Sequence, residues 1–178
     1  MRVVAQRVKT ASVAVENTIL GEIGEGLVLF VGVGRDDVAN VVGPGASPPE
    51  AVGTARAAAM AEKVANLRIF SDSEGRSNLS LLDIGGAALV ISQFTLFADC
   101  RRGRRPSFSE AADPGPAEAL VDEFRVALER LGVPTAAGRF GAHMVVSLVN
   151  DGPYTILLDS DVLAGPRSGR RSAVTGAD

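Results

Sequence analysis

The sequence is poor in the residues that form covalent cross-links and metal sites. Its 178 residues include one cysteine, Cys100, and one histidine, His143. A lone thiol excludes an intrachain disulfide. One His and one Cys also leave too few ligands for a zinc site built from these residue types. We therefore expect no metal and no cofactor, and the scarcity of cysteine suits a reducing compartment.

Long apolar runs and an excess of positive charge are also missing. No apolar stretch reaches the ~18 residues that a membrane span needs, and residues 1–6 do not resemble a signal peptide. The net charge is −3, so the chain is not basic as a whole. These features predict a cytoplasmic protein, and contact with nucleic acid would require a local basic patch.

What the sequence does contain is a strand-rich beginning. Val3, Ala5, Val13 and Val15 alternate with polar residues, which is the period-two pattern of strands with one buried face. Residues 27–31 are an unbroken apolar run, which predicts a strand covered on both faces.

Helical spacing of apolar residues predicts two helices, at about 54–67 and about 116–131. Further strands are expected at 87–95, 144–149 and 154–158. Strands at both ends with helices between them indicate an α+β fold with antiparallel or mixed sheets and two main helices outside.

A single domain is expected over residues 1–160, with two additions. Residues 40–53 are dense in Gly and Pro, which predicts an inserted surface loop that the fold does not need. Residues 161–178 contain few large apolar side chains, which predicts a flexible C-terminal extension.

The expected strand 87–95 closes with polar residues, Ser92, Gln93 and Thr95, around Phe94. Buried hydroxyl and amide groups need partners, so one interpretation is a strand end that hydrogen-bonds a neighbouring loop. The other is the wall of a site whose backbone N–H groups stabilise an oxyanion. Thr95 as a nucleophile would need a base in reach, and none lies near it in sequence.

A basic run occupies residues 101–105, where Arg101, Arg102, Arg104 and Arg105 surround a glycine. A solvated loop is one interpretation. Phosphate contact is the other, because the planar guanidinium binds phosphate through two hydrogen bonds.

Near the C-terminus, Gly152 and Pro153 separate two expected strands, which by itself predicts a hairpin turn. Arg7 could be a solvated strand charge. His143, beside Met144, could be a general base because its pKa is close to neutrality, although a lone His is more often a packed residue.

Several stretches together resemble the D-aminoacyl-tRNA deacylase family, over residues 1 to about 160. They are Gln6-Arg7-Val8, Ser92-Gln93-Phe94-Thr95-Leu96, and the segments 101–108, 138–144 and 150–155. Loop 40–53 looks longer than the family pattern, and the tail looks added.

The resemblance implies a homodimeric hydrolase that acts on D-aminoacyl-tRNA at its acceptor end, with achiral glycine also accepted. It implies that residues 92–95 line the pocket for the terminal adenosine. It also implies a cis Gly152–Pro153 bond that reaches into the partner subunit's pocket, held by Arg7 and meeting the amino acid near Met144. The ribose hydroxyl beside the ester would assist the reaction. Two alternatives remain: a hydrolase with Thr95 as nucleophile, and an RNA-binding module without catalysis.

Overall fold

A bent mixed sheet forms the centre of the computed structural model, which describes residues 1–38 and 49–165. The strand order is β2–β1–β3–β6–β7, and β8 pairs with β1. Pairs of β1 with its neighbours are antiparallel, whereas β3–β6 and β6–β7 are parallel. The strands are β1 (Arg2–Val15), β2 (Thr18–Ile23), β3 (Gly26–Gly32), β6 (Ala87–Ser92), β7 (Thr135–Ala137) and β8 (Val145–Asp159).

The expected strand patterns at the start of the chain are confirmed. Val3, Ala5, Val13 and Val15 are all buried in β1. Its alternation is interrupted at Arg7 and Val8, which are both buried and lie where the register against β8 shifts. Nearly every residue of β3 is buried because helices cover one face and the curled strands cover the other.

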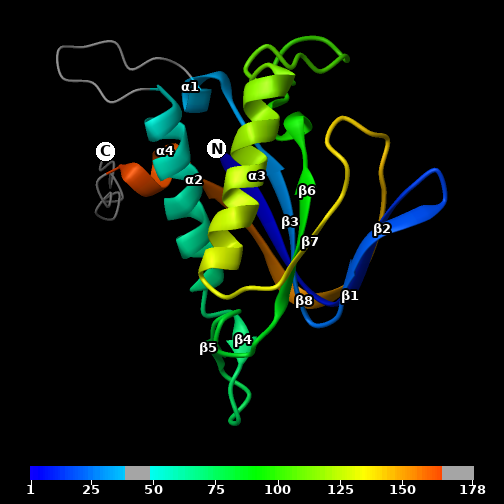
Figure 1. Cartoon of the computed structure of the whole chain (residues 1–178), viewed down its shortest axis with the longest axis vertical. Helices are drawn as coiled ribbons and strands as arrows, with labels where there is room; N and C mark the ends of the chain where they lie inside the picture. The colour runs from blue at the N-terminus through cyan, green and yellow to red at the C-terminus, as the bar shows by residue number, and fades with distance from the viewer. Residues whose placement is uncertain (39–48, 166–178) are drawn as a thin grey trace, which may run out of the picture.

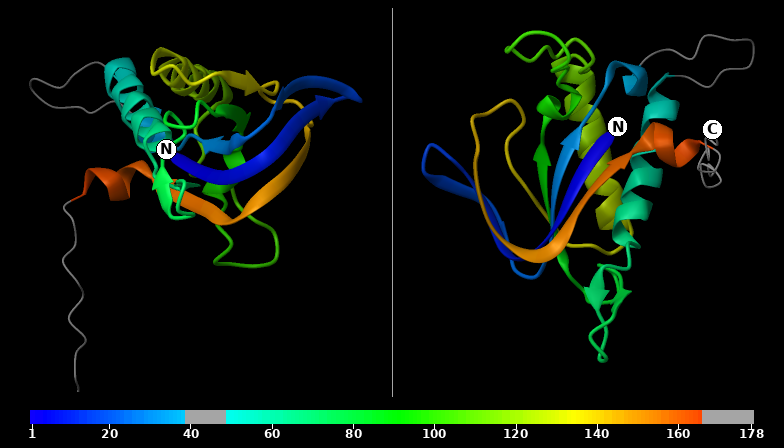
Figure 2. Two further views of the ribbon diagram at one scale, coloured as in Figure 1. Left: turned by 90° about the horizontal axis from the view of Figure 1, so that it is seen from below. Right: turned by 180° about the vertical axis from the view of Figure 1, so that it is seen from behind.

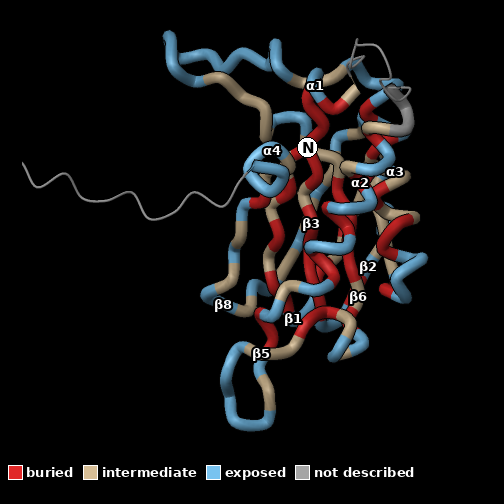
Figure 3. Tube along the Cα trace, turned by 90° about the vertical axis from the view of Figure 1, so that its left-hand side faces the viewer, coloured by how far each residue is buried: buried red, intermediate tan, exposed pale blue. Residues whose placement is uncertain are grey.

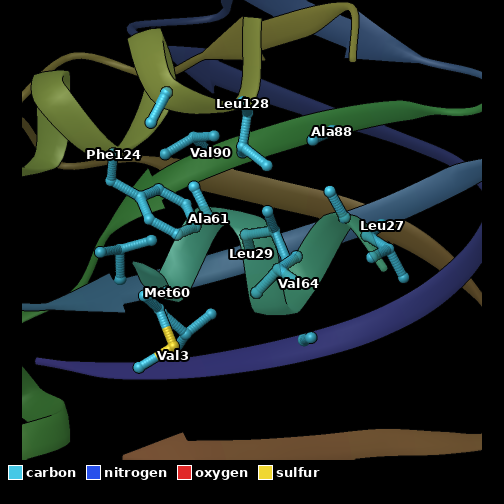
Figure 4. Packing of buried hydrophobic residues seen from close by; sticks show 14 of the residues in the cluster. Val3, Leu27, Leu29, Met60, Ala61, Val64, Ala88, Val90, Phe124 and Leu128 are labelled. Carbon is cyan, nitrogen blue, oxygen red and sulfur yellow. The ribbon is translucent and has the colours of Figure 1, made fainter. Parts of the chain in front are cut away.

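Helices α2 (Pro49–Ala65) and α3 (Pro114–Arg130) lie side by side on one face of the sheet (Figure 1). Between them and the sheet lies the main core, where Met60 and Phe124 meet Leu29 (Figure 4). The α+β prediction is therefore confirmed. Within the described residues, no helix is long and apolar enough to cross a membrane.

The other face of the sheet is covered by the chain itself. β2 and the first half of β8 curl around with β1 and nearly close the sheet (Figure 2). This encloses a second apolar cluster, which includes Val8, Val13, Val28, Leu89 and Ile91.

Shorter elements complete the described chain. The hairpin of β4 (Phe70–Ser71) and β5 (Ser77–Leu79) projects from one end of the molecule, and its tip is exposed (Figures 1 and 3). The remaining elements are α1 (Arg35–Val38), the 3₁₀ turn η1 (Phe94–Phe97) and α4 (Ser160–Ala164).

The predicted bounds of the inserted loop, 40–53, and of the C-terminal extension, 161–178, differ from the structure. Residues 49–53 are helical, so α2 begins five residues before the expected start, and residues 40–48 lie outside the described residues. Gly53 is buried against α3, because a Cβ there would meet Leu120 Cδ2 at 2.9 Å and the Asp37 carbonyl oxygen at 3.0 Å. The proposed tail likewise begins with α4, whose N-cap Asp159 accepts a hydrogen bond from the Asp161 N–H, and residues 166–178 are not described.

The predicted hairpin turn at Gly152 is wrong. The expected strands 144–149 and 154–158 are one strand, β8, which runs along β1 with interruptions in register. The Gly and Pro residues lie at such an interruption, because the long bent β1 holds both halves of β8 in one sheet.

The close packing of Gly53 leads to a test of the helix interface. Gly-to-Ala changes inside helices usually stabilise by ~0.5–1 kcal/mol. We expect Gly53→Ala instead to lower the free energy of unfolding by ~1 kcal/mol or more, because the new methyl group overlaps α3 and the α1 backbone. Gly115→Ala in α3 is the matched control, since a Cβ there meets nothing within 4 Å, and it should be neutral or stabilising. Urea denaturation measures both; stabilisation of equal size in both variants would contradict the tight packing.

Candidate functional site

The chain leaves the sheet immediately after β6. The Gln93 N–H still donates to the Val31 carbonyl at 2.8 Å, but the next residues fold into η1. Leu96 N–H donates to the Gln93 carbonyl at 3.3 Å and Ala98 N–H to the Thr95 carbonyl at 3.1 Å. The prediction of a strand through Thr95 is therefore wrong by three residues, because local turn hydrogen bonds replace the ladder after Ser92.

A pocket of about 630 Å³ opens beside this strand end. Ser92, Gln93 and Phe94 line it, and the segment before β8 adds His143 and Met144. The fold thus brings together two predicted groups that are far apart in sequence. Thr95 is exposed beside the pocket and does not line it.

The pocket carries an aromatic pair of Phe94, which the sequence predicted in the pocket wall, and Phe108, which sequence reasoning missed. The rings of Phe94 and Phe108 meet edge to face, with centroids 5.0 Å apart and planes at 72°. Their residues are 57% and 38% exposed, which is unusual for large apolar side chains. Phe108 is the last residue of the basic segment 101–108. Its place next to the arginines was the one feature of the sequence that could have indicated a role at the site. Exposed aromatic faces of this kind suit stacking against a nucleobase.

Two backbone N–H donors at this turn have no acceptor among the described residues. The N–H groups of Phe94 and Thr95 donate to no acceptor within the described residues, as expected for the first residues of a helical turn. The Gln93 side-chain amide donates to the Thr95 hydroxyl. No acidic, Lys or His side chain of the described chain hydrogen-bonds that hydroxyl, so a base for a threonine nucleophile is absent from this part of the structure.

Met144 lies beside a glycine at the other end of the same β7–β8 connection. A Cβ at Gly138 would overlap the Met144 sulfur atom, so only glycine leaves this space free. Met144 also packs against the second apolar cluster, which ties the pocket wall to the core.

The arginine loop is a separate exposed feature. Asp99 and Ser107 exchange two backbone hydrogen bonds of 2.7 and 3.0 Å that close its base, and Gly103 has a φ of +70° at its tip. Arg101 binds Asp99 through two contacts of 2.7 and 2.9 Å, and its side-chain hydrogen bond lowers the pKa of Asp99 to about 2.

The other arginines of this loop are unpaired. Arg102, Arg104 and Arg105 are exposed and form no ion pair within residues 1–38 and 49–165. None of the four arginines lines the pocket beside β6.

Arg7 is buried, with 7% of the residue exposed, and it holds the segment around Gly152. Its guanidinium donates to the carbonyl oxygens of Asp151 and Gly152, both at 3.1 Å, and lies 3.0 Å from the Asp151 carboxylate. It also donates to the Ile69 carbonyl. The interpretation of Arg7 as a solvated charge is wrong, and the Gly152–Pro153 peptide bond is cis as the resemblance implied.

Within one chain, the two predicted halves of the site lie apart. Arg7 pairs with Leu27 across β1 and β3, and Leu27 pairs with Ala88 at the start of β6. Ser92 is four residues further along β6, which at ~3.3 Å per residue is about 13 Å. Gly152 and Pro153 are exposed and line neither side of the pocket. In the described residues, no cluster of three or more His, Cys, Asp or Glu could hold a metal ion.

Comparison with known proteins agrees with the motifs. A family profile described as D-Tyr-tRNA(Tyr) deacylase matches residues 4–159. A protein named D-aminoacyl-tRNA deacylase from Roseiflexus sp. (strain RS-1) is 56% identical over 168 residues, which cover 94% of this chain and 99% of the relative. A protein of the same name from Thermomicrobium roseum is 54% identical over 93% of this chain and 97% of its own length.

Solved structures agree at the level of the fold. The "c-Myc DNA Unwinding Element Binding Protein" aligns with a TM-score of 0.75 and 31% identity over 89% of this chain and 98% of its own. A "probable eukaryotic D-amino acid tRNA deacylase" aligns with a TM-score of 0.68 over 88% of this chain and 97% of its own, at 18% identity, which supports the fold alone. The length and identity of these matches, together with the motif residues gathered at the ends of β6 and β8, show that this chain belongs to the D-Tyr-tRNA(Tyr) deacylase family.

Proposed function

We propose that this protein hydrolyses the ester bond of D-aminoacyl-tRNA and releases the free D-amino acid and the tRNA. The observation that carries the proposal is the pocket at the end of β6, where Ser92, Gln93 and Phe94 lie beside N–H groups with free hydrogen atoms. Relatives that are more than half identical to this chain bear the name of this activity.

The pocket offers a place for each part of the terminal aminoacyl-adenosine. The aromatic pair of Phe94 and Phe108 would stack on the adenine base. The N–H group of Phe94, which lines the pocket, would bind the ester carbonyl oxygen as it becomes an oxyanion. The chain's own groups therefore supply binding and charge stabilisation.

A deacylation assay with matched D- and L-aminoacyl-tRNA tests this function. We expect the D-ester to be hydrolysed, glycyl-tRNA to be accepted because glycine has no side chain to exclude, and the L-ester to be spared. Acid-gel separation of charged and free tRNA gives the rates. A protein that binds tRNA but hydrolyses neither ester would be a binding module, and one that hydrolyses both enantiomers equally would be an unselective hydrolase.

The selectivity is proposed to come from a second copy of the chain. The Gly152–Pro153 segment is exposed and does not line the pocket of its own chain, so we infer that it completes the pocket of a partner. β8 pairs only with β1 among the described strands, which leaves its other edge open. The side chains of Val145, Val149 and Leu157 on this strand are 59%, 57% and 65% exposed. Open edges and exposed apolar residues favour pairing of two copies about a two-fold axis.

In this arrangement the segment would act as a rigid filter. Arg7 fixes the carbonyl groups of Asp151 and Gly152, so the segment would enter the partner's pocket as a preformed wall. Backbone atoms of Gly152 and Pro153 would then contact the amino group of a D-residue, with Met144 on the facing side, and would leave no space for an L side chain.

The arginine loop is proposed to bind phosphates near the acceptor end. Arg101 is already neutralised by Asp99, which stays charged at any pH well above its pKa of about 2. The net positive charge of the loop therefore comes from Arg102, Arg104 and Arg105.

Salt dependence distinguishes phosphate contact from a solvated loop. Each lost phosphate contact should reduce the slope of log affinity against log salt by ~0.7–0.9. We expect replacement of Arg102, Arg104 and Arg105 by Ala to flatten the slope by this amount for each contact. Arg101→Ala in the same loop is the matched control and should change the slope less. Filter binding at several salt concentrations measures the slope. Identical slopes in all variants would show that the loop is solvated and makes no phosphate contact.

The nucleophile is proposed to be a water assisted by the substrate's own RNA. Ester hydrolysis needs an activated nucleophile, and within the described residues Gln93 is the hydrogen-bond partner of the Thr95 hydroxyl, with no base beside it. The ribose hydroxyl next to the ester is held in place once the adenosine binds. Positioning of this kind supplies up to ~7–11 kcal/mol of barrier reduction in intramolecular reactions.

Two changes separate RNA assistance from a threonine nucleophile. Thr95→Ala should keep activity within roughly tenfold, whereas loss of a nucleophile costs several orders of magnitude. A tRNA that ends in 2′-deoxyadenosine and is charged on the 3′-hydroxyl should bind normally but react slowly. Single-turnover rates decide between them. An inactive Thr95→Ala variant combined with normal cleavage of the deoxy substrate would establish the threonine hydrolase instead.

A further inference from the structure

Tyr154 connects the filter segment to a part of the molecule that has no assigned role. Its ring lies beside the Arg7 guanidinium, with the Arg7 Cζ atom 4.5 Å from the ring centroid. Its hydroxyl donates to the Ser77 hydroxyl at the start of β5. A cation over an aromatic ring and a hydroxyl pair are both attractive contacts, so Tyr154 is held at both ends.

Arg7 makes a second connection to the same hairpin. It donates to the Ile69 carbonyl, one residue before β4, and the Phe70 ring centroid lies 5.9 Å from its Cζ atom. The guanidinium is therefore close to the aromatic rings of both Tyr154 and Phe70. Two hydrogen bonds therefore connect the β4–β5 hairpin with residues that flank or hold the filter segment. One joins Arg7 to Ile69, and the other joins Tyr154 to Ser77.

Contacts of the neighbouring residues hold the filter segment, Gly152 and Pro153. Gln6 Nε2 donates to the side chains of Asn150 and Thr155 on either side of it. Gly152 and Pro153 are exposed on the protomer surface, and a Cβ at Gly152 would meet a single atom, Asn150 Nδ2 at 3.7 Å. Burial therefore does not place these residues, so flanking contacts must. Arg7 holds the N-terminal side through Asp151 and Gly152, and Tyr154 is the first residue on the other side.

We propose that Tyr154 is a positioning residue for enantiomer selection, which sets the place of Gly152 and Pro153 by tying them to the β4–β5 hairpin through Ser77. The inference rests on the proposed function, because it assigns a role in the selectivity of the same site. The hairpin then serves as a support: it takes no part in the reaction, but it fixes the position of Gly152 and Pro153 within β8.

Removing the hydroxyl pair tests this role while keeping the ring. Tyr154→Phe retains the ring against Arg7 and loses the hydrogen bond, and Ser77→Ala removes the other partner. Each change should lower the ratio of D- to L-ester hydrolysis by roughly threefold to tenfold, the size of one hydrogen bond. The double variant should be no worse than either single variant, because both remove one interaction.

Ser73→Ala is the matched control, since Ser73 is exposed in the same hairpin and its hydroxyl makes no hydrogen bond within the described chain. It should leave the ratio unchanged. Melting temperature and the KM for D-aminoacyl-tRNA are measured alongside. We expect the ratio to fall mainly through faster L-ester hydrolysis, with the KM for the D-ester nearly constant.

Three results would overturn the proposal. Variants that melt at a lower temperature but keep the wild-type D/L ratio would make the Tyr154–Ser77 pair purely structural. Additive losses in the double variant would show that the two residues act separately. A wild-type protein that hydrolyses neither ester would overturn the proposed function itself, and this role with it.

Discussion

The buried guanidinium of Arg7 joins β8 to the β4–β5 hairpin, and the candidate site depends on this connection. A charge with 7% of its residue exposed must be hydrogen-bonded and paired, because an unsatisfied buried charge costs several kcal/mol. Its partners come from two places in the chain: Ile69 before the β4–β5 hairpin, and Asp151 and Gly152 in β8. The requirement to satisfy one side chain therefore helps to hold an exposed segment of β8, and Tyr154 adds a second contact with the same hairpin.

The same sheet geometry that places Arg7 also separates the two halves of the site. β1, β3 and β6 run side by side, so residues at opposite ends of these strands cannot meet within one chain. The pocket at Ser92 to Phe94 and the filter at Gly152 are functional together only if a second copy brings them into contact. In the proposed dimer, the Gly152–Pro153 segment is held by the core of the subunit that contributes it. It can therefore be rigid and still leave the other subunit's pocket open to substrate.

Local patterns in the sequence predicted much of the fold. In β1, β3 and α3 most of the buried residues are apolar. The residue type alone therefore indicated most of the positions that face the core. The errors arose where long-range pairing overrides local signals. β8 remains one strand through Gly152 because β1 holds both of its halves, and the strand at Thr95 yields to a 3₁₀ turn. The arrangement of Phe108 and His143 around Phe94 could not be foreseen, because nothing local encodes a contact between separate loops.

Subunit complementation tests the central claim, a site shared by two chains, most directly. Gly152→Leu should block the partner subunit's pocket with the added side chain while leaving its own chain folded, because a Cβ there meets one atom, Asn150 Nδ2, at an ordinary contact distance of 3.7 Å. A Gln93→Ala and Phe94→Ala variant should disable the pocket. Each variant alone should be nearly inactive. After unfolding and refolding a 1:1 mixture, random pairing should give half of the dimers one intact site, and activity should recover to roughly a quarter of the wild-type value. A mixture that stays as inactive as its components, although the variants are shown to pair, would mean that each chain carries a complete site and would contradict the account.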